Sequence, residues 1–462
     1  MKKAIAVFLT IIFVYICAVP AFSDSDTGSA DTFVPVIRFV ASSDTHIVSS
    51  NDVNRDRIIK MFNLAYDVAE SDSNYSSLDA VLIAGDLTND GTRDEFDKFG
   101  KAISDSVRGD TKFLGVVAKN HDGYEMKRQE LRDYYKQVTG NDADFHVVIN
   151  GYHFFGISAS DKDGIHYSTE QLNWLDKELA QVTKAEPDKP VFIINHEHVR
   201  NTVYGSSAYD GWGITTFKSI FNKYPQVVSF TGHSHYPLND PRSVWQGKFT
   251  AVGTGAITYS EFTIDESRAY HPSDCSDTAT CWIVELDAQN NMRLRGYDVN
   301  ESVLLCERFL ENPADNKNRE YTPAKRKAAS SAPAFAEGSA IEVNPEEGAC
   351  TVTVPVAQST DGEPVILYRA FAKNKLGMTV AQSWTLPQYY RAIDFDTVEL
   401  KLSDLPGGDY TISVVAENAY EMQSDPLTAE VSIDGETGFA GLLTLISGLF
   451  ERIKAFFVRL FW

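Results

Sequence analysis

Five short apolar segments of this chain each lead into a polar group of the kind that binds metal ions. The segments are 36–42, 80–85, 112–118, 191–195 and 227–232, and a sixth apolar segment without such a group follows at 249–253. Short apolar runs bounded by polar residues are typical of buried strands. Amphipathic stretches at 51–70 and 168–182 predict helices between them, the second opening with the capping pair Ser168 and Gln171. This alternation favours an α/β layered domain with a site at the carboxyl ends of its strands.

The polar groups at the strand ends contain oxygen and nitrogen donors but no sulfur. Each one alone has an ordinary explanation, because an aspartate often caps a turn and a lone histidine is often hydrogen-bonded in a core. Together they favour a site for divalent ions such as Mn, Fe or Zn. The motifs are Asp44-Thr45-His46, Gly85-Asp86, Asn120-His121-Asp122, His196 and Gly232-His233-Ser234-His235.

The order D-x-H, GD, NHD, H, GHxH resembles that of the calcineurin-like metallophosphoesterases, over residues 36–256. The resemblance implies a four-layer αββα sandwich with two divalent metal ions, which activate a bridging hydroxide for attack on a phosphoester. His121 would contact the phosphoryl group or protonate the leaving oxygen. Carried over by position, one ion would be held by Asp44, His46, Asp86 and His235, and the other by Asp86, Asn120, His196 and His233.

The chain departs from the family pattern at two positions. Lys119 stands where the family has glycine, and a positive φ there would strain it. Asn89 stands where some members have an aspartate that orients the histidine. In "NHEH", His198 competes with His196 for the ligand position, and we favour His196. Cations near the motifs that we expect to bind substrate are Lys119, Arg200 and Arg242.

The substrate is predicted to be a small phosphodiester or phosphomonoester. "GDLTN" lacks the tyrosine of purple acid phosphatases and the signature of Ser/Thr protein phosphatases, which favours diesters. A net charge of −22 argues against nucleic acid as partner. The alternative is a non-catalytic cell-surface binding protein on the same scaffold. A periplasmic 5′-nucleotidase is disfavoured, because the carboxyl-terminal module is short and reads as a β-sandwich.

The first residues of the chain predict an exported protein that is extracellular or attached to the cell surface. Residues 1–23 have the layout of a signal peptide, with an uncleaved anchor as the alternative. The phosphoesterase domain is expected over 33–310, followed by a linker or surface strap at 311–338. Cysteines 275, 281, 306 and 350 would remain, either as free thiols or as disulfides, of which 275–281 is one possible small loop.

The carboxyl-terminal part changes character twice. Residues 339–434 contain short alternating strands that predict an all-β sandwich of the Ig or fibronectin type III kind, and "LSDLPGGDYTISVVAENAY" resembles a fibronectin type III domain with Tyr410 as the tyrosine corner. Such a module suggests an unknown cell-surface ligand. Residues 439–462 have the apolar spacing of an amphipathic helix, expected on an anionic membrane surface or, as the alternative, on a protein partner.

Overall fold

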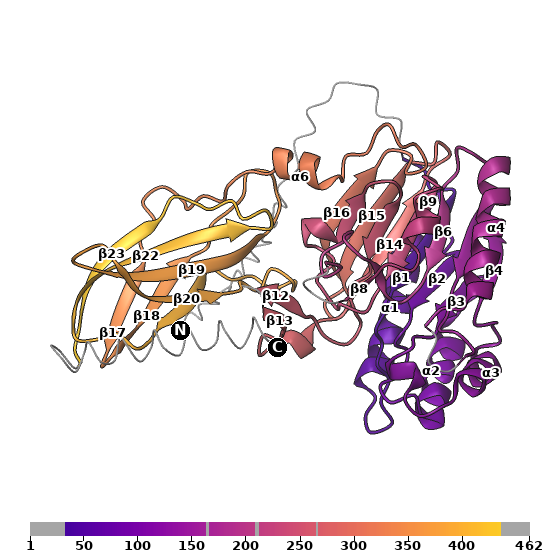
Figure 1. Cartoon of the computed structure of the whole chain (residues 1–462), viewed down its shortest axis with the longest axis horizontal. Coiled ribbons are helices and arrows are strands. Elements are labelled where there is room, and N and C mark those ends of the chain that lie inside the picture. The colour runs from indigo at the N-terminus through magenta and orange to yellow at the C-terminus, as the bar shows by residue number, and fades with distance from the viewer. Residues whose placement is uncertain (1–32, 163–165, 208–211, 265–266, 436–462) are drawn as a thin grey trace, which may run out of the picture. The chain divides into compact units, whose positions relative to one another are not determined.

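The computed structural model describes residues 33–162, 166–207, 212–264 and 267–435 (Figure 1). The predicted signal peptide at 1–23 and the predicted amphipathic helix at 439–462 lie outside the described residues. In the part of the chain that is described, the structure contains no helix with the length and apolar character needed to span a bilayer.

Two six-stranded sheets form the α/β part of the chain (Figure 1). The first contains, in spatial order, β16 (Val303–Leu310), β15 (Met292–Asp298), β14 (Thr280–Leu286), β1 (Ile37–Ser42), β2 (Ala80–Ala84) and β3 (Lys112–Val116). The second contains β10 (Val244–Gln246), β11 (Thr250–Gly253), β9 (Val227–Thr231), β6 (Val191–Ile194), β5 (Tyr152–Gly156) and β4 (Phe145–Ile149). Strands β1–β3 are parallel, as are β5, β6, β9 and β11. All six strands expected from the sequence are present.

The two sheets pack face to face and bury one apolar layer between them. At its centre, the ring of Phe39 from β1 contacts Phe154, Phe192 and Phe230 from the second sheet, with ring centroids 5.3, 5.0 and 5.7 Å away. Because the strands here are buried on both faces, they read in the sequence as continuous apolar runs.

Helices cover the outer face of each sheet, which completes four layers. The first sheet is covered by α1 (Val53–Ser71), α2 (Arg93–Ser106) and α3 (Arg128–Thr139), and the second by α4 (Thr169–Ala185) and α5 (Lys218–Phe221). The predicted capping box at the start of α4 is confirmed, since Ser168 and Gln171 bond each other's backbone N–H groups with their side chains. The remaining short elements of this part are η1 (His121–Gly123), η2 (Pro241–Ser243), η3 (Cys275–Asp277), β7 (His198–Val199), β8 (Gly213–Ile214), β12 (Phe262–Ile264) and β13 (Ser267–Tyr270).

The segment after β16 lies against the second sheet. Arg319 donates to Thr250 Oγ1 at 3.0 Å and to the carbonyl oxygen of Pro225 at 2.7 Å. The backbone N–H of Tyr321 donates to Gln246 Oε1 at 3.1 Å, and a short helix, α6 (Pro323–Ala329), follows. This segment is therefore an ordered strap where it carries Arg319 and Tyr321.

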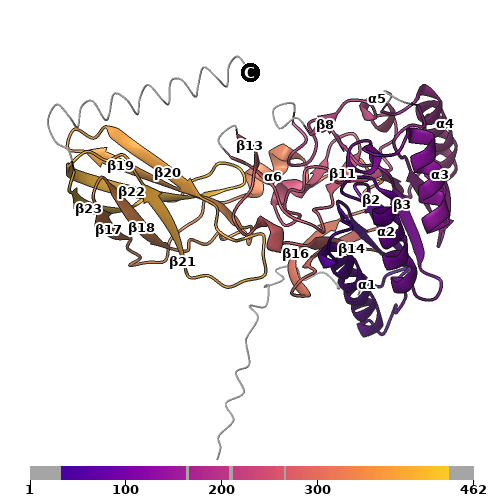
Figure 2. The same cartoon turned by 90° about the horizontal axis from the view of Figure 1, so that it is seen from below.

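The carboxyl-terminal residues form two antiparallel sheets that share one core (Figure 2). One sheet contains β17 (Glu342–Glu346), β18 (Ala349–Pro355) and β21 (Thr397–Leu402); the other contains β20 (Thr379–Thr385), β19 (Val365–Asn374), β22 (Gly408–Asn418) and β23 (Leu427–Ile433). The phenol of Tyr410 donates to the carbonyl oxygen of Pro406 at 2.7 Å. A tyrosine corner makes a bond of this kind to the backbone a few residues upstream.

The four cysteines of the described residues are all free thiols. Cys281 lies in the core beneath α1–α3, and burial raises the pKa of its thiol to about 12. The small loop that a 275–281 disulfide would close is therefore not formed in this structure.

Candidate metal centre

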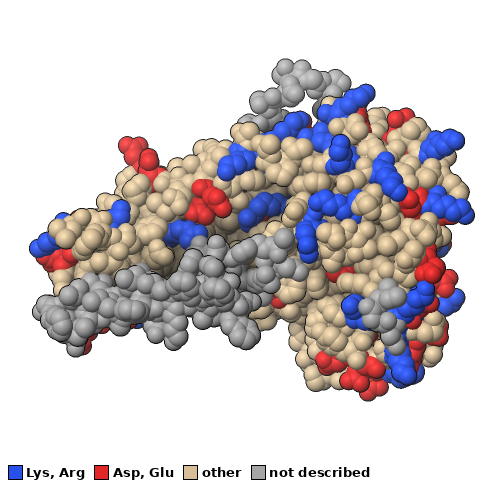
Figure 3. Space-filling model, in the orientation of Figure 1, with Lys and Arg blue, Asp and Glu red and all other residues tan. Residues whose placement is uncertain are grey.

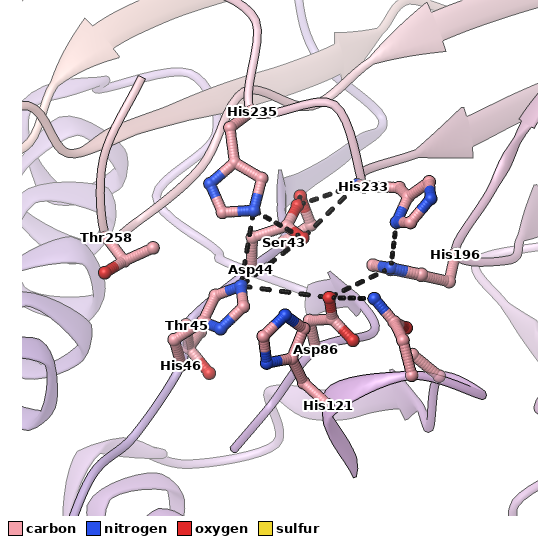
Figure 4. Close-up of polar contacts among 12 residues, drawn as sticks. Ser43, Asp44, Thr45, His46, Asp86, His121, His196, His233, His235 and Thr258 are labelled. Carbon is pink, nitrogen blue, oxygen red and sulfur yellow. Dashed lines mark hydrogen bonds and ion pairs between the residues drawn. The ribbon is translucent and has the colours of Figure 1, made fainter. Parts of the chain in front are cut away.

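The candidate ligands come together at the carboxyl ends of five strands (Figure 4). Asp44 and His46 follow β1, Asp86 follows β2 and Asn120 follows β3, which are neighbours in the first sheet. His196 follows β6, and His233 and His235 follow β9, which are neighbours in the second sheet. Because both sheets end at the same place, seven side chains from distant parts of the sequence face one another.

The backbone at most of these positions has a positive φ, a left-handed conformation that residues other than glycine rarely adopt. Five of the seven candidate ligands have φ between 40° and 73°, namely Asp44, His46, Asp86, His233 and His235. Left-handed backbone costs about 1–3 kcal/mol per residue and persists where the surrounding structure imposes it, often at functional sites. Such concentrated strain points to a functional role for this cluster.

Among the described residues, the possible metal-ligating atoms fall into three groups, and within each the atoms lie within 4.8 Å of one another. The first contains Asp44, His46 and His235, and the second contains Asp86, His196 and His233. A third group of His46, Asp86 and His121 overlaps both. In the first, Nε2 of His235 lies 3.3 Å from Asp44 Oδ1 and 3.3 Å from Nε2 of His46.

Asp86 belongs to both sides of the cluster. Its Oδ2 lies 3.2 Å from Nε2 of His196 and 3.8 Å from Nε2 of His46. The amide of Asn120 donates to this same oxygen at 2.9 Å. Asp86 therefore occupies the position that a bridging carboxylate requires.

Two buried oxygens of the cluster have no hydrogen-bond partner among the described residues. They are Oδ1 of Asp86 and Oδ1 of Asn120. Buried polar atoms are nearly always paired, so an unpaired one indicates a missing water or ion. Oxygen and imidazole nitrogen are suitable ligands for Mn, Fe or Zn. The residues present therefore fit a pair of divalent ions.

Hydrogen bonds behind the cluster orient two of the imidazoles. Nδ1 of His196 lies 2.8 Å from the carbonyl oxygen of Ala84, and Nδ1 of His235 lies 3.2 Å from that of Tyr259. In each ring this nitrogen carries a proton and donates to the carbonyl oxygen, so Nε2 faces the centre. Metal-binding histidines are usually held in this way. Burial opposes protonation of both rings, but Asp86 raises the pKa of His196 and Asp44 raises that of His235. A metal ion at Nε2 would therefore replace a proton.

Burial sets the protonation of the other two imidazoles. Burial lowers the pKa of His46 to about 3, assisted by His235, and lowers that of His233 to about 4, assisted by His196. Both rings are therefore neutral near pH 7, the form that binds metal. Burial opposes ionisation of Asp44 and Asp86 as well, but the neighbouring histidines hold the pKa of each carboxylate below its usual range.

The absence of a side chain at Gly232 lets the loop after β9, which carries His235, approach Asp44. Its backbone passes so near β1 that a Cβ there would lie 2.4 Å from Asp44 Oδ2. The backbone N–H of His233 donates to that oxygen at 3.0 Å, and the hydroxyl of Ser43 also donates to it. The glycine of "GHSH" is thus required by the close approach of the two sheets.

His121 lies at the edge of the cluster and remains partly exposed. Its Nδ1 lies 2.8 Å from the carbonyl oxygen of Asn89, so the backbone of Asn89 orients the ring in place of an aspartate side chain. Its ring packs against that of His46 with centroids 4.4 Å apart. The neighbouring Lys119 is partly exposed and is not among the residues with positive φ, so the glycine-to-lysine change brings no such strain.

The other predicted residues lie in different environments. His198 is buried with Nδ1 2.6 Å from Thr231 Oγ1 and Nε2 2.7 Å from Ser234 Oγ, so His196 is the histidine that faces the cluster. Arg200 donates to the carbonyl oxygen of Gly213 at 3.1 Å. Arg242 pairs with Asp240 at 2.6 Å. No contact of Arg200 or Arg242 with a candidate ligand occurs among the described residues, and their roles in substrate binding remain predictions.

Sequence reasoning missed the aromatic residues that surround the histidines. The ring of Tyr259 lies 4.1 Å from that of His235, Trp212 lies 5.0 Å from His233, and Tyr124 lies 5.0 Å from His121. Tyr124 is 60% exposed. These residues carry no motif, and only the fold brings them to the site.

Sequence reasoning named Asp122 as part of the "NHD" motif but gave it no role. Its buried carboxylate accepts from the backbone N–H groups of Thr88 and Ala118, which joins the loops after β2 and β3. Burial, with the charge of Asp86 nearby, raises the pKa of Asp122 to about 7.

Comparisons with known proteins agree with this site. Residues 37–237 match the calcineurin-like phosphoesterase family. Over 202 residues the chain is 27% identical to a probable glycerophosphodiester phosphodiesterase, GpdQ, of Arcobacter nitrofigilis; the match covers 42% of this chain and 71% of the relative. Over residues 37–237 the chain therefore matches a calcineurin-like phosphoesterase domain, in agreement with the motifs.

Matches among solved structures include a purple acid phosphatase, PPD1, from yellow lupin (Lupinus luteus) seeds. It is 14% identical with a TM-score of 0.41, and the match covers 60% of this chain and 53% of the plant chain, about half its length. The phosphopantetheinyl hydrolase PptH of Mycobacterium tuberculosis is 16% identical with a TM-score of 0.28, covering 49% of this chain and 91% of that one.

Proposed function

We propose that this protein is an exported, metal-dependent phosphoesterase that hydrolyses small phosphodiesters in preference to phosphomonoesters. The observation that carries the proposal is the position of Asp86 between two ligand groups, 3.8 Å from His46 of one and 3.2 Å from His196 of the other, with unpaired buried oxygens on Asp86 and Asn120. When bound, two divalent ions supply positive charge for the phosphate and lower the pKa of the attacking water to about 7. The ligands would be those carried over by position: Asp44, His46, Asp86 and His235 for one ion, and Asp86, Asn120, His196 and His233 for the other.

Two side chains beside the metal centre, His121 and Lys119, would act on the substrate directly, and His121 would donate a proton to the leaving oxygen. His121, kept in place by the carbonyl oxygen of Asn89, is partly exposed beside His46 and can reach a phosphoryl oxygen or the leaving oxygen. An alkoxide is a poor leaving group, so a diester with such a group requires a proton donor, and His121 takes this role. Lys119, next to Asn120, is placed to add a cation for the anionic substrate.

The preference for diesters rests on the chain's motifs and on its relative. The position three residues after Asp86 is Asn89, where purple acid phosphatases carry tyrosine. The relative from Arcobacter nitrofigilis is described as a probable glycerophosphodiester phosphodiesterase. A polymeric nucleic acid is a poor fit, because a chain of net charge −22 repels a polyanion.

The terminal segments complete the proposal. Residues 1–23 would direct export, and residues 439–462 would hold the protein to an anionic membrane surface. The carboxyl-terminal sheets would form a fibronectin type III-like module with a cell-surface ligand. Its seven described strands in sheets of three and four, together with the bond from Tyr410 to Pro406, support this assignment.

A phosphoester panel with added manganese tests the activity. Rates on bis(p-nitrophenyl) phosphate should exceed those on p-nitrophenyl phosphate, and glycerophosphodiesters should be hydrolysed as well. His121→Ala is the active-site variant and Lys223→Ala the control, since Lys223 is exposed and pairs with Asp176 on α4 at 2.7 Å. A protein that binds fewer than two ions per chain and hydrolyses none of these esters would instead be a non-catalytic binding protein. A clear preference for the monoester would contradict the diester assignment.

A further inference from the structure

A cavity of about 450 Å³ lies in this chain, and none of the seven candidate ligands lines it. Its walls come from the loop 201–207, from the segment 241–245 and from the strap that carries Tyr321 and α6. Cavities of roughly 300–1,000 Å³ are typical of small-molecule sites. The metal-centre chemistry makes no use of this cavity.

Several aromatic side chains line the cavity. Tyr204, Trp245 and Tyr321 line it. The guanidinium of Arg242 lies over the ring of Tyr204 at 3.8 Å, and that of Arg326 lies over the ring of Tyr321 at 5.0 Å. Flat aromatic faces with cations beside them suit a planar ring better than a branched aliphatic group.

The charge at the cavity is positive although the chain as a whole is acidic. Arg242, Arg326 and Lys327 line it. Asp240 pairs with Arg242, and Glu363 pairs with both Arg326 and Arg308. With Lys327 there are four cationic side chains here and two carboxylates to balance them. Lys and Arg side chains gather around α6 on the face shown in Figure 3.

Part of this charge is not used within the protein. Lys327 is exposed and has no ion pair among the described residues, and the buried Nε of Arg326 has no hydrogen-bond partner there either. The exposed ammonium group of Lys327 is a donor, and a ligand that pairs with it must offer an acceptor.

The loop that forms one wall packs tightly, so the cavity is a defined feature of the fold. The ring of Tyr204 lies 4.3 Å from that of Tyr236, and the backbone N–H of Tyr204 donates to the carbonyl oxygen of Arg242 at 3.0 Å. Gly205 has φ +85°, and a Cβ there would lie 2.8 Å from Ser234. The shape of the cavity is therefore set before any ligand enters.

We propose that this cavity is a second ligand site, separate from the metal centre, that binds a planar aromatic molecule with one anionic group. The ring lies against Tyr204, Trp245 and Tyr321, and the anion faces Lys327 and Arg326. The inference is independent of the proposed phosphoesterase activity, because it requires neither the metal ligands nor turnover.

Two matched probes test the site in the full-length protein. One is 8-anilinonaphthalene-1-sulfonate, and the other is N-phenyl-1-naphthylamine, which has the same rings without the sulfonate. Lys327→Glu should weaken binding of the sulfonate by about fivefold, the effect of about 1 kcal/mol at an exposed ion pair. It should leave binding of the neutral probe unchanged. Lys325→Glu is the control, because Lys325 is exposed on the same helix but does not line the cavity.

Two further readouts locate the bound probe. Trp245→Phe should lower the energy transfer from tryptophan to the bound sulfonate. Removal of metal ions with EDTA should leave the affinity unchanged. Equal weakening by Lys327→Glu and Lys325→Glu, unchanged energy transfer in Trp245→Phe, or loss of binding with EDTA would each overturn the proposal.

Discussion

Replacement of Gly232 by alanine tests the geometry of the metal centre with the smallest possible change. The substitution adds one methyl group and leaves every candidate ligand in the sequence. A Cβ at this position would lie 2.3 Å from Ser43 Oγ and 2.4 Å from Asp44 Oδ2. Both distances are below the 3.0 Å that real Cβ atoms keep, so one of the two segments must move.

The structure indicates what that movement costs. Ser43 and Asp44 are fully buried, so neither can turn toward solvent. Overpacking at such a site typically costs about 1–3 kcal/mol of stability. Relief by movement of Asp44 takes the carboxylate away from His235, and a displacement of about 1 Å at an active site reduces the rate by about a hundredfold. We expect Gly232→Ala to lose metal from the group that contains Asp44 and most of its activity.

Gly253→Ala is the matched control. A Cβ at Gly253 would have its nearest neighbour, Ser243 O, at 3.6 Å, which is ordinary van der Waals contact. The assay compares metal content by mass spectrometry, kcat/KM on bis(p-nitrophenyl) phosphate and the urea midpoint of unfolding for the three proteins. Full metal content and wild-type activity in Gly232→Ala, or equal losses in Gly253→Ala, would refute the reasoning.

Three further predictions follow from the ligand arrangement and the terminal segment. Asp86→Ala should abolish activity and lower the content of both ions. His121→Ala should retain both ions but lose about 10²–10⁴-fold in kcat. Metal loss in the His121 variant would show that the role of His121 is misassigned. Chelation should lower the melting temperature, because an ion at 100 times its dissociation constant stabilises a site by about 2.7 kcal/mol; excess manganese should restore it, and an unchanged melting temperature on chelation would argue against bound ions. Truncation after residue 436 should leave catalysis intact and abolish binding to anionic vesicles, with each Lys or Arg contributing about 1 kcal/mol at the surface; vesicle binding that survives the truncation would place the contact elsewhere.

The strands could be predicted from the sequence, and the candidate ligands proposed from it, because both leave local signals. A strand buried on two faces must be apolar along its whole length, so β1, β2 and β6 were recognisable as such. The donor residues directly follow these strands. In the structure His196 faces the cluster, whereas Thr231 and Ser234 contact both nitrogens of His198; the ligand role of His196 stays a prediction.

Other features could not be predicted because they depend on which distant segments meet. Arg242 is close to the motifs in the chain, yet it pairs with Asp240 and lines the cavity of the second proposed site. Trp212 and Tyr124 carry no motif and reach the histidines only through the fold. The backbone of Asn89 orients His121, a role for which the side chain at that position is silent.

Local sequence was enough to indicate which strands exist and which candidate donor follows each of them. That information is local, since hydrophobic periodicity and adjacent motifs lie within a few residues. How the donors meet depends on the fold, through the parallel registers of β1–β3 and of β6 with β9, and through the approach of Gly232 to Asp44. Sheet packing also imposed the left-handed backbone at five ligands. Strain of this kind is sustained by contacts between distant segments, and no single segment of the sequence encodes it.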